Sequence, residues 1–339
     1  MRRKWFAIAI AACLTLSLIA IPLAGGCAAP APAKTYNWIM SSYMPEGYIL
    51  YDLSVDFIER VQTESDGRIS IEHYPGDLLG DYETQMKSTT AGTQDLAISS
   101  PSTVNSPKWD LNVTFYITPD WDAAKRDYAQ PDGWLWKAYG GISHECNWQL
   151  LGLPLQGFTG IISNVKFDPM PGPKDVKIRV MASETARLIL EGIGFSPVTI
   201  PWSEIPSAMM LGTVDAAWGP TSADDFAMLS DVYEYAYRFN TNAGTNMNVI
   251  NLELFNSLDS ADQEMLLRIG KEWQEYCFSV YVDHDNAAWD ELKKTKTVIE
   301  LTREEWEANA KIAGPIQYPY LEGVIGKELT DQARAHAPK

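Results

Sequence analysis

The sequence predicts an α/β protein of two domains that are joined by one long helix. Short apolar strands alternate with amphipathic helices from Lys34 onward, and the same alternation returns after a mixed stretch at 105–170. Beyond Ser260, helical spacing of apolar residues continues for about 35 residues, far more than the ~11–12 residues of an average helix. A chain of 339 residues is long enough for two such domains.

The first run of elements has the order β-α-β-α-β. It consists of expected strands at 36–40, 68–73 and 95–98 and expected helices at about 48–63 and 81–90. The helix at 48–63 repeats its apolar residues at 3.6-residue spacing, whereas the strand at 68–73 alternates apolar and polar residues after the turn at Asp66-Gly67. Strands that alternate with helices favour a mainly parallel sheet covered by those helices.

The second run repeats this order between residues 176 and 218. It consists of expected strands at 176–180, 197–200 and 214–218 and expected helices from 183 to about 190 and at 203–211. Ser183 is placed to cap the first of these helices, and Gly192 and Gly194 are placed to end it. Two runs of one order indicate two α/β domains.

The last long segment is expected to be a helix that crosses both domains. Ser260-x-x-Gln263 predicts a capping box at its start, and apolar spacing continues towards Leu292 without a glycine or proline after Gly270. A coiled coil is the alternative, but no clean heptad survives three repeats. Because a helix of this length exceeds one small domain, it predicts a strut between the two.

Charge and composition exclude one class of partner. Asp and Glu total 44 against 27 Lys and Arg, which gives a net charge of −17. A surface this acidic repels phosphate backbones and anionic lipid, and no run of basic residues follows Lys4. The apolar share of 46% is that of a globular protein. We therefore expect a folded protein that binds no nucleic acid.

The N-terminus has the features of an export signal at 1–26. Arg2-Arg3-Lys4 form a basic start, and an apolar stretch runs from Trp5 to Leu23. Residues 23–26 before Cys27 resemble the bacterial lipobox, although the large aliphatic residue stands one position too early. Residues 27–35, rich in alanine and proline, suit a tether. We expect a lipoprotein anchored through Cys27; the alternatives are simple secretion and a retained apolar anchor.

The cysteines are too few for a disulfide framework. Cys13 lies in the export signal and Cys27 is the candidate lipid site, which leaves Cys146 and Cys277. An oxidising compartment allows these two to pair. Burial of both as free thiols, acting as small hydrophobic side chains, is the alternative.

No sequence motif supports an enzyme or a cofactor. GxSxG, HExxH, CxxC and P-loop motifs are absent, and Gly192-Ile193-Gly194 indicates the end of a helix rather than a nucleotide-binding loop. No two of the four histidines have metal-ligand spacing, so no metal site is expected. The acidic pairs Asp224-Asp225 and Glu304-Glu305 are expected on helix surfaces. A secreted two-domain α/β hydrolase, with paired carboxylates in its cleft, is the alternative.

Two groups of residues form motifs that recur in one known family. The first group is Ser65-Asp66-Gly67-Arg68-Ile69, followed by Tyr74-Pro75 and Leu79-Gly80. The second lies between Val176 and Pro220 and contains Lys177-Ile178-Arg179-Val180, Pro201-Trp202-Ser203-Glu204-Ile205 and Gly212-Thr213-Val214-Asp215. In this order and spacing they resemble the substrate-binding proteins of TRAP transporters, or DctP-like receptors. With the export signal and the long helix, the resemblance covers about 37–330.

The resemblance implies a two-lobed, periplasmic-binding-protein-like α/β fold with a hinge and a long helix crossing both lobes. It places lobe I at 36–156 plus about 245–284 and lobe II at 157–244 plus about 285–332. It also implies an extracytoplasmic receptor, in the periplasm or at the cell surface, that performs no chemistry. Such a receptor closes around a small organic acid and delivers it to the small and large membrane subunits of a TRAP transporter, which run on an ion gradient.

The resemblance implies that Arg179 clamps the carboxylate of the ligand. In the family an arginine ends the Lys-Ile-Arg-Val strand, and its planar fork forms two parallel hydrogen bonds that lysine cannot copy. Without the resemblance, Arg179 would be an outward-facing strand residue that pairs with Asp175 or meets water.

Three positions depart from the family pattern. Thr159 stands where sialic-acid-type members have a second arginine, and Gly219 replaces an asparagine that many members have before the proline corresponding to Pro220. Ala217 stands where some keto-acid-binding relatives have an acidic metal ligand. Thr159 and Gly219 thus remove two polar side chains that bind the ligand in relatives, and Ala217 argues against a bound cation.

The remaining candidates are aromatic or polar residues at or beside positions that line the cleft in relatives: Tyr43, Tyr82, Ser100, Trp202, Trp218 and Asn246. Ordinary packing is the alternative for each aromatic residue, and for Trp202 above all. One arginine, several aromatic rings and few other charges predict a monocarboxylate ligand with an apolar or aromatic remainder. A receptor that serves a sensor kinase or another carrier is a second alternative to transport.

Overall fold

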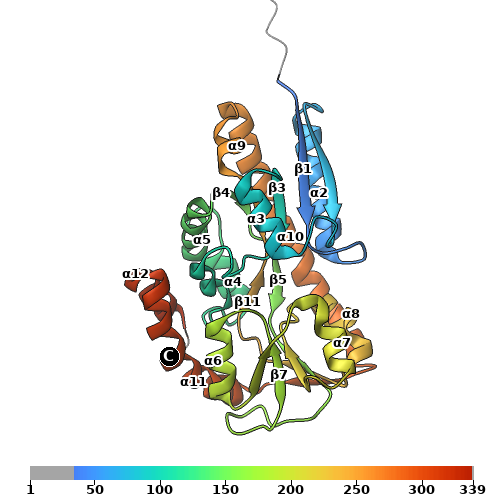
Figure 1. The fold of residues 1–339 in the computed structure, drawn as a ribbon, viewed down its shortest axis with the longest axis vertical. Helices are drawn as coiled ribbons and strands as arrows, with labels where there is room; N and C mark the ends of the chain where they lie inside the picture. The colour runs from blue at the N-terminus through green and yellow to red at the C-terminus, as the bar shows by residue number, and fades with distance from the viewer. Residues whose placement is uncertain (1–33, 338–339) are drawn as a thin grey trace, which may run out of the picture. The chain divides into compact units, whose positions relative to one another are not determined.

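The structure, a computed structural model, describes residues 34–337, apart from the side chains of residues 223, 224 and 286. These residues form two α/β lobes, each built on one sheet (Figure 1). The predicted export signal, the Cys27 lipid site and most of the predicted tether lie outside the described residues.

The first sheet has the strand order β2-β1-β3-β12-β4. Its strands are β1 (Tyr36–Ser42), β2 (Ile69–Pro75), β3 (Leu96–Ser99), β4 (Trp148–Gly152) and β12 (Met247–Asn251). Strand β1 runs parallel to both β2 and β3, as the β-α-β-α-β order predicts. Strand β12 is antiparallel to β3 and β4 and comes from a distant part of the chain, so local alternation does not predict it.

Helices cover both faces of this sheet. They are η1 (Pro107–Val113), a 3₁₀ helix, and the α-helices α2 (Ile49–Glu64), α3 (Tyr82–Ala91), α4 (Trp121–Asp127), α5 (Trp134–Glu145) and α9 (Leu252–Asn256). One apolar core lies between the sheet, α2 and the long helix, around Phe57 and Trp273. The other joins α5 and η1 to the sheet, around the stacked rings of Trp109 and Trp148.

The second sheet has the order β13-β10-β6-β9-β7-β8. Its strands are β6 (Ile161–Ser163), β7 (Lys177–Val180), β8 (Ser196–Thr199), β9 (Ala216–Trp218), β10 (Tyr235–Arg238) and β13 (Thr297–Glu300). Strand β7 is parallel to β8 and β9, as the second run of alternating strands and helices predicts. Strand β6 is antiparallel to β9 and β10.

The helices of this lobe also lie on two faces. They are α6 (Glu184–Ile193), α7 (Ile205–Met210), α8 (Ala223–Met228) and α11 (Arg303–Ile325), with the 3₁₀ helices η2 (Trp202–Glu204) and η3 (Ser230–Val232). The last helix, α12 (Lys327–His336), packs on the first lobe instead: its Ala333 belongs to a core of that lobe, and the His336 ring stacks on Trp134 of α5. Helices α6 and α11 share one core with the sheet. Helices α7 and α8 share the other with the end of the long helix.

The sequence places the start of α6 correctly and its end only in part. The Ser183 hydroxyl accepts a hydrogen bond from Ala186 N at 3.1 Å, as an N-cap should. Gly194 ends the helix with a φ of 114°, a left-handed conformation that glycine adopts readily. Gly192 lies inside the helix and does not end it. The structure divides the predicted helix at 203–211 in two. Its first residues belong to the 3₁₀ helix η2, and the α-helix α7 begins only at Ile205.

The predicted strut is present as α10 (Ser260–Leu292), a helix of 33 residues. Its cap is Asp259 rather than the predicted Ser260: the Asp259 carboxylate accepts from Asp262 N at 3.0 Å. A carboxylate one position earlier is the stronger acceptor at a helix N-terminus. In the first lobe Trp273 packs on Phe57 of α2, and in the second the Trp289 ring lies 4.6 Å from that of Phe226 in α8.

A small two-stranded sheet joins the lobes beside α10. It pairs β5 (Leu155–Phe158) with β11 (Ala243–Thr245) in antiparallel fashion. Glycine is required in β11, because a Cβ at Gly244 would lie 1.9 Å from the Thr221 side chain. The chain therefore brings the segment after β9 into direct contact with the connecting strands.

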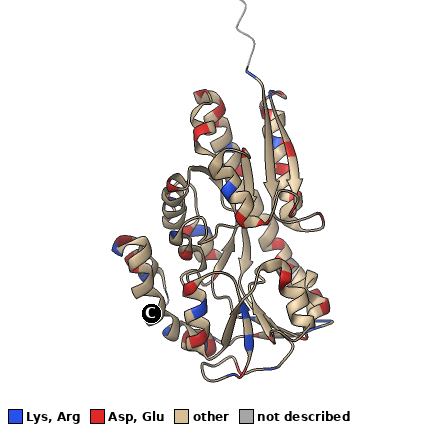
Figure 2. Cartoon of the chain, viewed as in Figure 1, with Lys and Arg blue, Asp and Glu red and all other residues tan. Residues whose placement is uncertain are grey.

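The two remaining cysteines are free and buried. Cys146 and Cys277 form no disulfide with each other. Of the two alternatives, the structure therefore favours buried free thiols that act as small hydrophobic side chains. Burial raises the pKa of both thiols. Acidic and basic side chains are spread over the helices of both lobes (Figure 2). None of the helices within residues 34–337 combines the length and the apolar character needed to cross a membrane.

Candidate ligand-binding site

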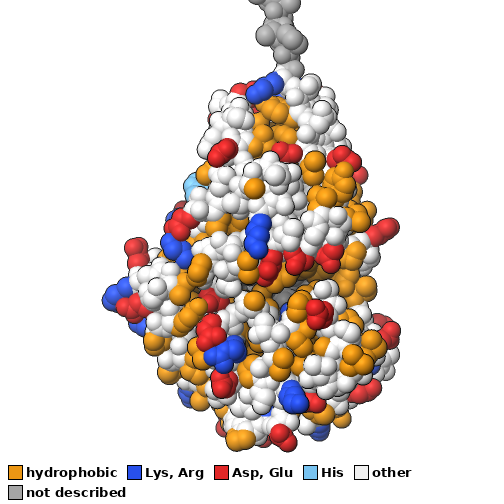
Figure 3. Space-filling view, viewed as in Figure 1, with side chains coloured by type: hydrophobic (Ala, Val, Ile, Leu, Met, Phe, Trp, Pro, Cys, Tyr) orange, Lys and Arg blue, Asp and Glu red, His pale blue; other side chains and the backbone are white. Residues whose placement is uncertain are grey.

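A cavity of about 90 Å³ lies where the two lobes meet, and 18 residues line it. Figure 3 shows this face of the protein hollowed between the lobes, with acidic side chains above the hollow. The first lobe contributes residues at the ends of parallel strands, such as Tyr43 after β1 and Ser100 after β3. The second lobe contributes Arg179 from β7 and Gly219 after β9. Open α/β sheets bind ligands at the carboxyl ends of their strands, so this is the expected place for a site.

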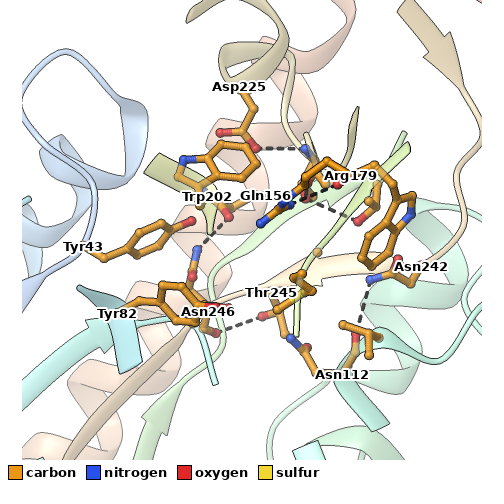
Figure 4. A pocket seen from close by; sticks show the side chains of 18 residues that line it. Tyr43, Tyr82, Asn112, Gln156, Arg179, Trp202, Asp225, Asn242, Thr245 and Asn246 are labelled. Carbon is orange, nitrogen blue, oxygen red and sulfur yellow. Dashed lines mark hydrogen bonds between the residues drawn. The ribbon is translucent and has the colours of Figure 1, made fainter. Parts of the chain in front are cut away.

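All nine residues that the sequence singles out line this one cavity. They are Tyr43, Tyr82, Ser100, Thr159, Arg179, Trp202, Trp218, Gly219 and Asn246. The strands and loops that carry them are separated by up to 203 positions (246 − 43) along the chain. The fold thus brings the nine residues together, and Figure 4 shows several of them around the cavity.

Arg179 is held rigidly at the floor of the cavity. It is 2% exposed, and its Nε donates to Ile200 O at 2.7 Å. Its Nη1 donates to Trp218 O at 3.1 Å. Two backbone carbonyls therefore orient the guanidinium. The predicted alternative, an outward-facing side chain paired with Asp175, does not occur.

The charge of Arg179 is not balanced by a protein carboxylate. Among the side chains that the structure describes, none forms an ion pair with it. Burial lowers the pKa of Arg179 to about 10, and the nearby Tyr82 acts in the opposite direction. The guanidinium is therefore still protonated at neutral pH. A buried cation without a counter-charge is costly, and an anion bound in the cavity would offset that cost.

Gly219 allows the protein backbone to approach Arg179 closely. Its φ is 146°, and a Cβ there would lie 2.7 Å from Arg179 Nη1 and 3.3 Å from the Trp202 ring. The Trp202 ring itself lies 5.8 Å from the guanidinium carbon. The asparagine that many relatives have at this position would not fit without moving both side chains.

We predict that Gly219→Ala weakens anion binding by about tenfold or more, because a displacement of about 1 Å at a clamp is enough to lose its geometry. Gly212→Ala is the matched control: Gly212 also has a positive φ, but no atom lies within 4 Å of the place that its new methyl group would take. Both variants should lose some stability through backbone strain. Calorimetric titration with a bound acid checks the prediction, and wild-type affinity in Gly219→Ala would contradict it.

Trp218 and Thr159 line the cavity but are tied into the protein. Trp218 is 1% exposed, stacks on Phe115 at 5.2 Å and donates from Nε1 to Thr241 Oγ1 at 3.0 Å. The Thr159 hydroxyl lies 3.3 Å from that of Thr221. Neither residue supplies a second cation in place of the arginine of sialic-acid-type relatives.

Side-chain amides form the polar wall that connects the lobes. Asn246 Nδ2 donates to Gln156 Oε1 at 2.6 Å, and Asn242 Nδ2 donates to Asn112 O at 3.2 Å. The Thr245 hydroxyl donates to Asn246 O at 2.9 Å. These bonds hold the amide groups in fixed orientations at the cavity wall, which favours a ligand with defined polar groups.

One expectation is wrong: Asp225 does not lie on a helix surface. It is 3% exposed and lines the cavity. Its Oδ2 accepts from Thr221 N at 2.9 Å and from Ser222 N at 3.2 Å, in a capping box at the start of α8. The burial of this helix start depends on tertiary packing, which acidic residue spacing alone does not reveal.

The sequence also misses eight further lining residues. They are Asn112, Val113, Gln156, Met181, Thr221, Asn242, Gly244 and Thr245. One signal was present for several of them: residues 240–248 alternate amides and hydroxyls within a stretch that is otherwise typical of a buried strand. Buried amides need partners, so such a stretch indicates a polar cavity.

No group of three or more His, Cys, Asp or Glu residues in the described part of the chain could hold a metal ion. Ala217, which stands at the acidic position of keto-acid-binding relatives, is buried in β9.

Comparison with known proteins identifies the family. Residues 40–318 match the model of the family described as bacterial extracellular solute-binding protein, family 7. The chain belongs to this family. The match includes strands of both sheets and every residue that lines the cavity.

Family 7 relatives cover nearly the whole chain at low identity. The ectoine-binding periplasmic protein TeaA of Halomonas elongata is 21% identical over 318 residues, 89% of this chain and 90% of its own. A TRAP periplasmic solute-binding protein of Ralstonia eutropha, solved with bound (S)-2-acetolactate, has a TM-score of 0.80 at 21% identity and covers 88% of this chain and 98% of its own. One from Sulfurospirillum deleyianum with bound succinate has a TM-score of 0.76 at 20% identity and covers 89% and 99%.

The comparisons confirm the two-lobed fold and the DctP-like family that the sequence predicts. The family 7 protein is thus an extracellular solute-binding protein by family. Its relatives are receptors rather than enzymes.

Proposed function

We propose that this family 7 protein captures a small monocarboxylate between its lobes and delivers it to the membrane subunits of a TRAP transporter. The observation that carries the proposal is Arg179: a buried, protonated guanidinium that faces the cavity and has no ion pair with a described carboxylate. Its fork suits two parallel hydrogen bonds to a carboxylate. Two of the solved relatives hold carboxylate anions, (S)-2-acetolactate with one carboxylate and succinate with two, which supports a carboxylate ligand here.

The lining favours one carboxylate rather than two. Arg179 is the one Lys or Arg among the 18 lining residues. The cavity of about 90 Å³ is smaller than the roughly 150 Å³ space in which benzene fits, so it favours the short aliphatic end of the predicted range over an aromatic remainder. Closure of the lobes would exclude water and strengthen the charged pair.

The export signal and Cys27 complete the proposal. A receptor tethered through a lipid at Cys27 would stay beside its membrane subunits while residues 27–35 span the gap. Intact-mass measurement of the membrane-associated protein would show the diacylated Cys27 if this is right, and a chain without lipid if the protein is simply secreted.

A thermal-shift screen tests the ligand class. The purified protein is heated with short monocarboxylates, dicarboxylates, sugar acids, sugars and inorganic anions. A ligand at ~100 times its dissociation constant should stabilise the folded state by ~2.7 kcal/mol, which raises the unfolding midpoint. The proposal predicts a shift from monocarboxylates and little from sugars or inorganic anions. Succinate binding at least as tight as that of any monocarboxylate would count against it.

A further inference from the structure

An acidic side chain lines the cavity together with the basic one. Asp225 and Arg179 both line it, yet no ion pair joins them within the described side chains. The two groups come from separate elements, the start of α8 and strand β7. Figure 4 shows both side chains at the cavity wall. A ligand that fills the cavity therefore meets two opposite charges.

The Asp225 carboxylate is fixed in place by its own helix. Its Oδ2 accepts two backbone N–H groups, those of Thr221 and Ser222. These two bonds fix the orientation of the Asp225 side chain at the cavity wall.

Aromatic rings surround the same part of the cavity. Tyr43 and Tyr82 lie edge to face at 6.5 Å, and Trp202 lines the cavity beside them. Burial, and then the charge of Asp225, raise the pKa of Tyr43 well above its usual value, which places the Tyr43 phenol in the field of that carboxylate. The faces of aromatic rings attract cations. These rings and Asp225 thus favour the same kind of ligand group.

We infer that the ligand is a compact acid that also carries a protonated nitrogen, which Asp225 pairs with while Arg179 holds the carboxylate. The inference rests on the proposed function and narrows its substrate class. A second carboxylate near Asp225 would be repelled, so the same residue disfavours dicarboxylates.

Matched ligand pairs test the inference. Affinities are measured by calorimetry for β-alanine against propanoate, 4-aminobutanoate against butanoate, and proline against cyclopentanecarboxylate, which differ only in the nitrogen. At least one nitrogen-bearing acid should bind about tenfold or more tightly than its partner. Equal or tighter binding of the nitrogen-free acid in every pair would overturn the inference and leave the proposed monocarboxylate receptor intact. Absence of binding by every acid would overturn both.

The variant Asp225→Asn assigns the effect to one residue. The amide oxygen of asparagine can still accept from Thr221 N and Ser222 N, so α8 keeps its cap. The variant should lose the preference for the nitrogen-bearing acid while it still binds the nitrogen-free one. Asp231→Asn is the control, because Asp231 is an exposed acid of the same lobe that does not line the cavity. A preference that survives in Asp225→Asn would contradict the assignment.

Discussion

Arg179→Ala is expected to weaken carboxylate binding by about 2–5 kcal/mol, tens- to thousands-fold in affinity, because it removes one partner of a buried charge-assisted pair. The change also leaves Ile200 O and Trp218 O without their donor. Calorimetry with a bound acid measures the loss, and unfolding without ligand shows how much of it is a loss of folding.

Two further variants separate charge from geometry. Arg179→Lys keeps the charge without the planar fork, so its affinity should fall between those of the wild type and Arg179→Ala. Arg187→Ala removes the same charge from the surface of α6, where Arg187 pairs with Glu184 and Glu191, and should leave affinity unchanged. Unchanged affinity in Arg179→Ala would show that the carboxylate binds elsewhere.

Trp273→Ala is expected to lower the free energy of unfolding by about 3–5 kcal/mol. The Trp273 side chain is fully buried, its ring lies 5.5 Å from that of Phe57, and its Nε1 donates to Leu53 O at 2.7 Å. The variant therefore creates a cavity and removes the hydrogen bond from the indole to Leu53 O. Denaturant unfolding measures the change.

Leu267→Ala provides the matched control on the same helix, because Leu267 is 39% exposed. It should change the free energy of unfolding by less than about 0.5 kcal/mol. A similar loss in both variants would contradict this account, because it would show that burial of the Trp273 side chain does not decide the effect. Helix α10 packs on both α2 and α8, and α8 carries Asp225, so the same packing supports the binding site.

The parallel parts of both sheets could be predicted because their order is local. Strand, helix and strand follow one another within about 30 residues, so periodicity alone places β1 to β3 and β7 to β9. Strand β12 returns to the first sheet from about 150 residues away, and no local signal reports such a pairing. Helix α11 continues through Pro315 and Pro319, which a sequence pattern would take as breaks.

The candidate site also has one part that the sequence predicts and one part that it does not. Arg179 could be named because it stands in a strand motif that resembles the family. The structure adds why it is oriented: the carbonyl of Ile200 after β8 and that of Trp218 at the end of β9 hold it. Asp225 could not be named, because its place in the cavity depends on the packing of the start of α8 and not on local sequence spacing. The fold decides which charged side chains line the same cavity. That set of side chains in turn decides which ligands the protein can bind.

A crystal structure of the protein with the acid that raises its unfolding midpoint most would show directly whether Arg179 holds the ligand. We expect the ligand carboxylate to lie between the lobes and to accept hydrogen bonds from the Arg179 guanidinium at about 2.7–2.9 Å. A ligand bound outside the cavity, or one inside it whose carboxylate does not contact Arg179, would show that this arginine is not the carboxylate clamp.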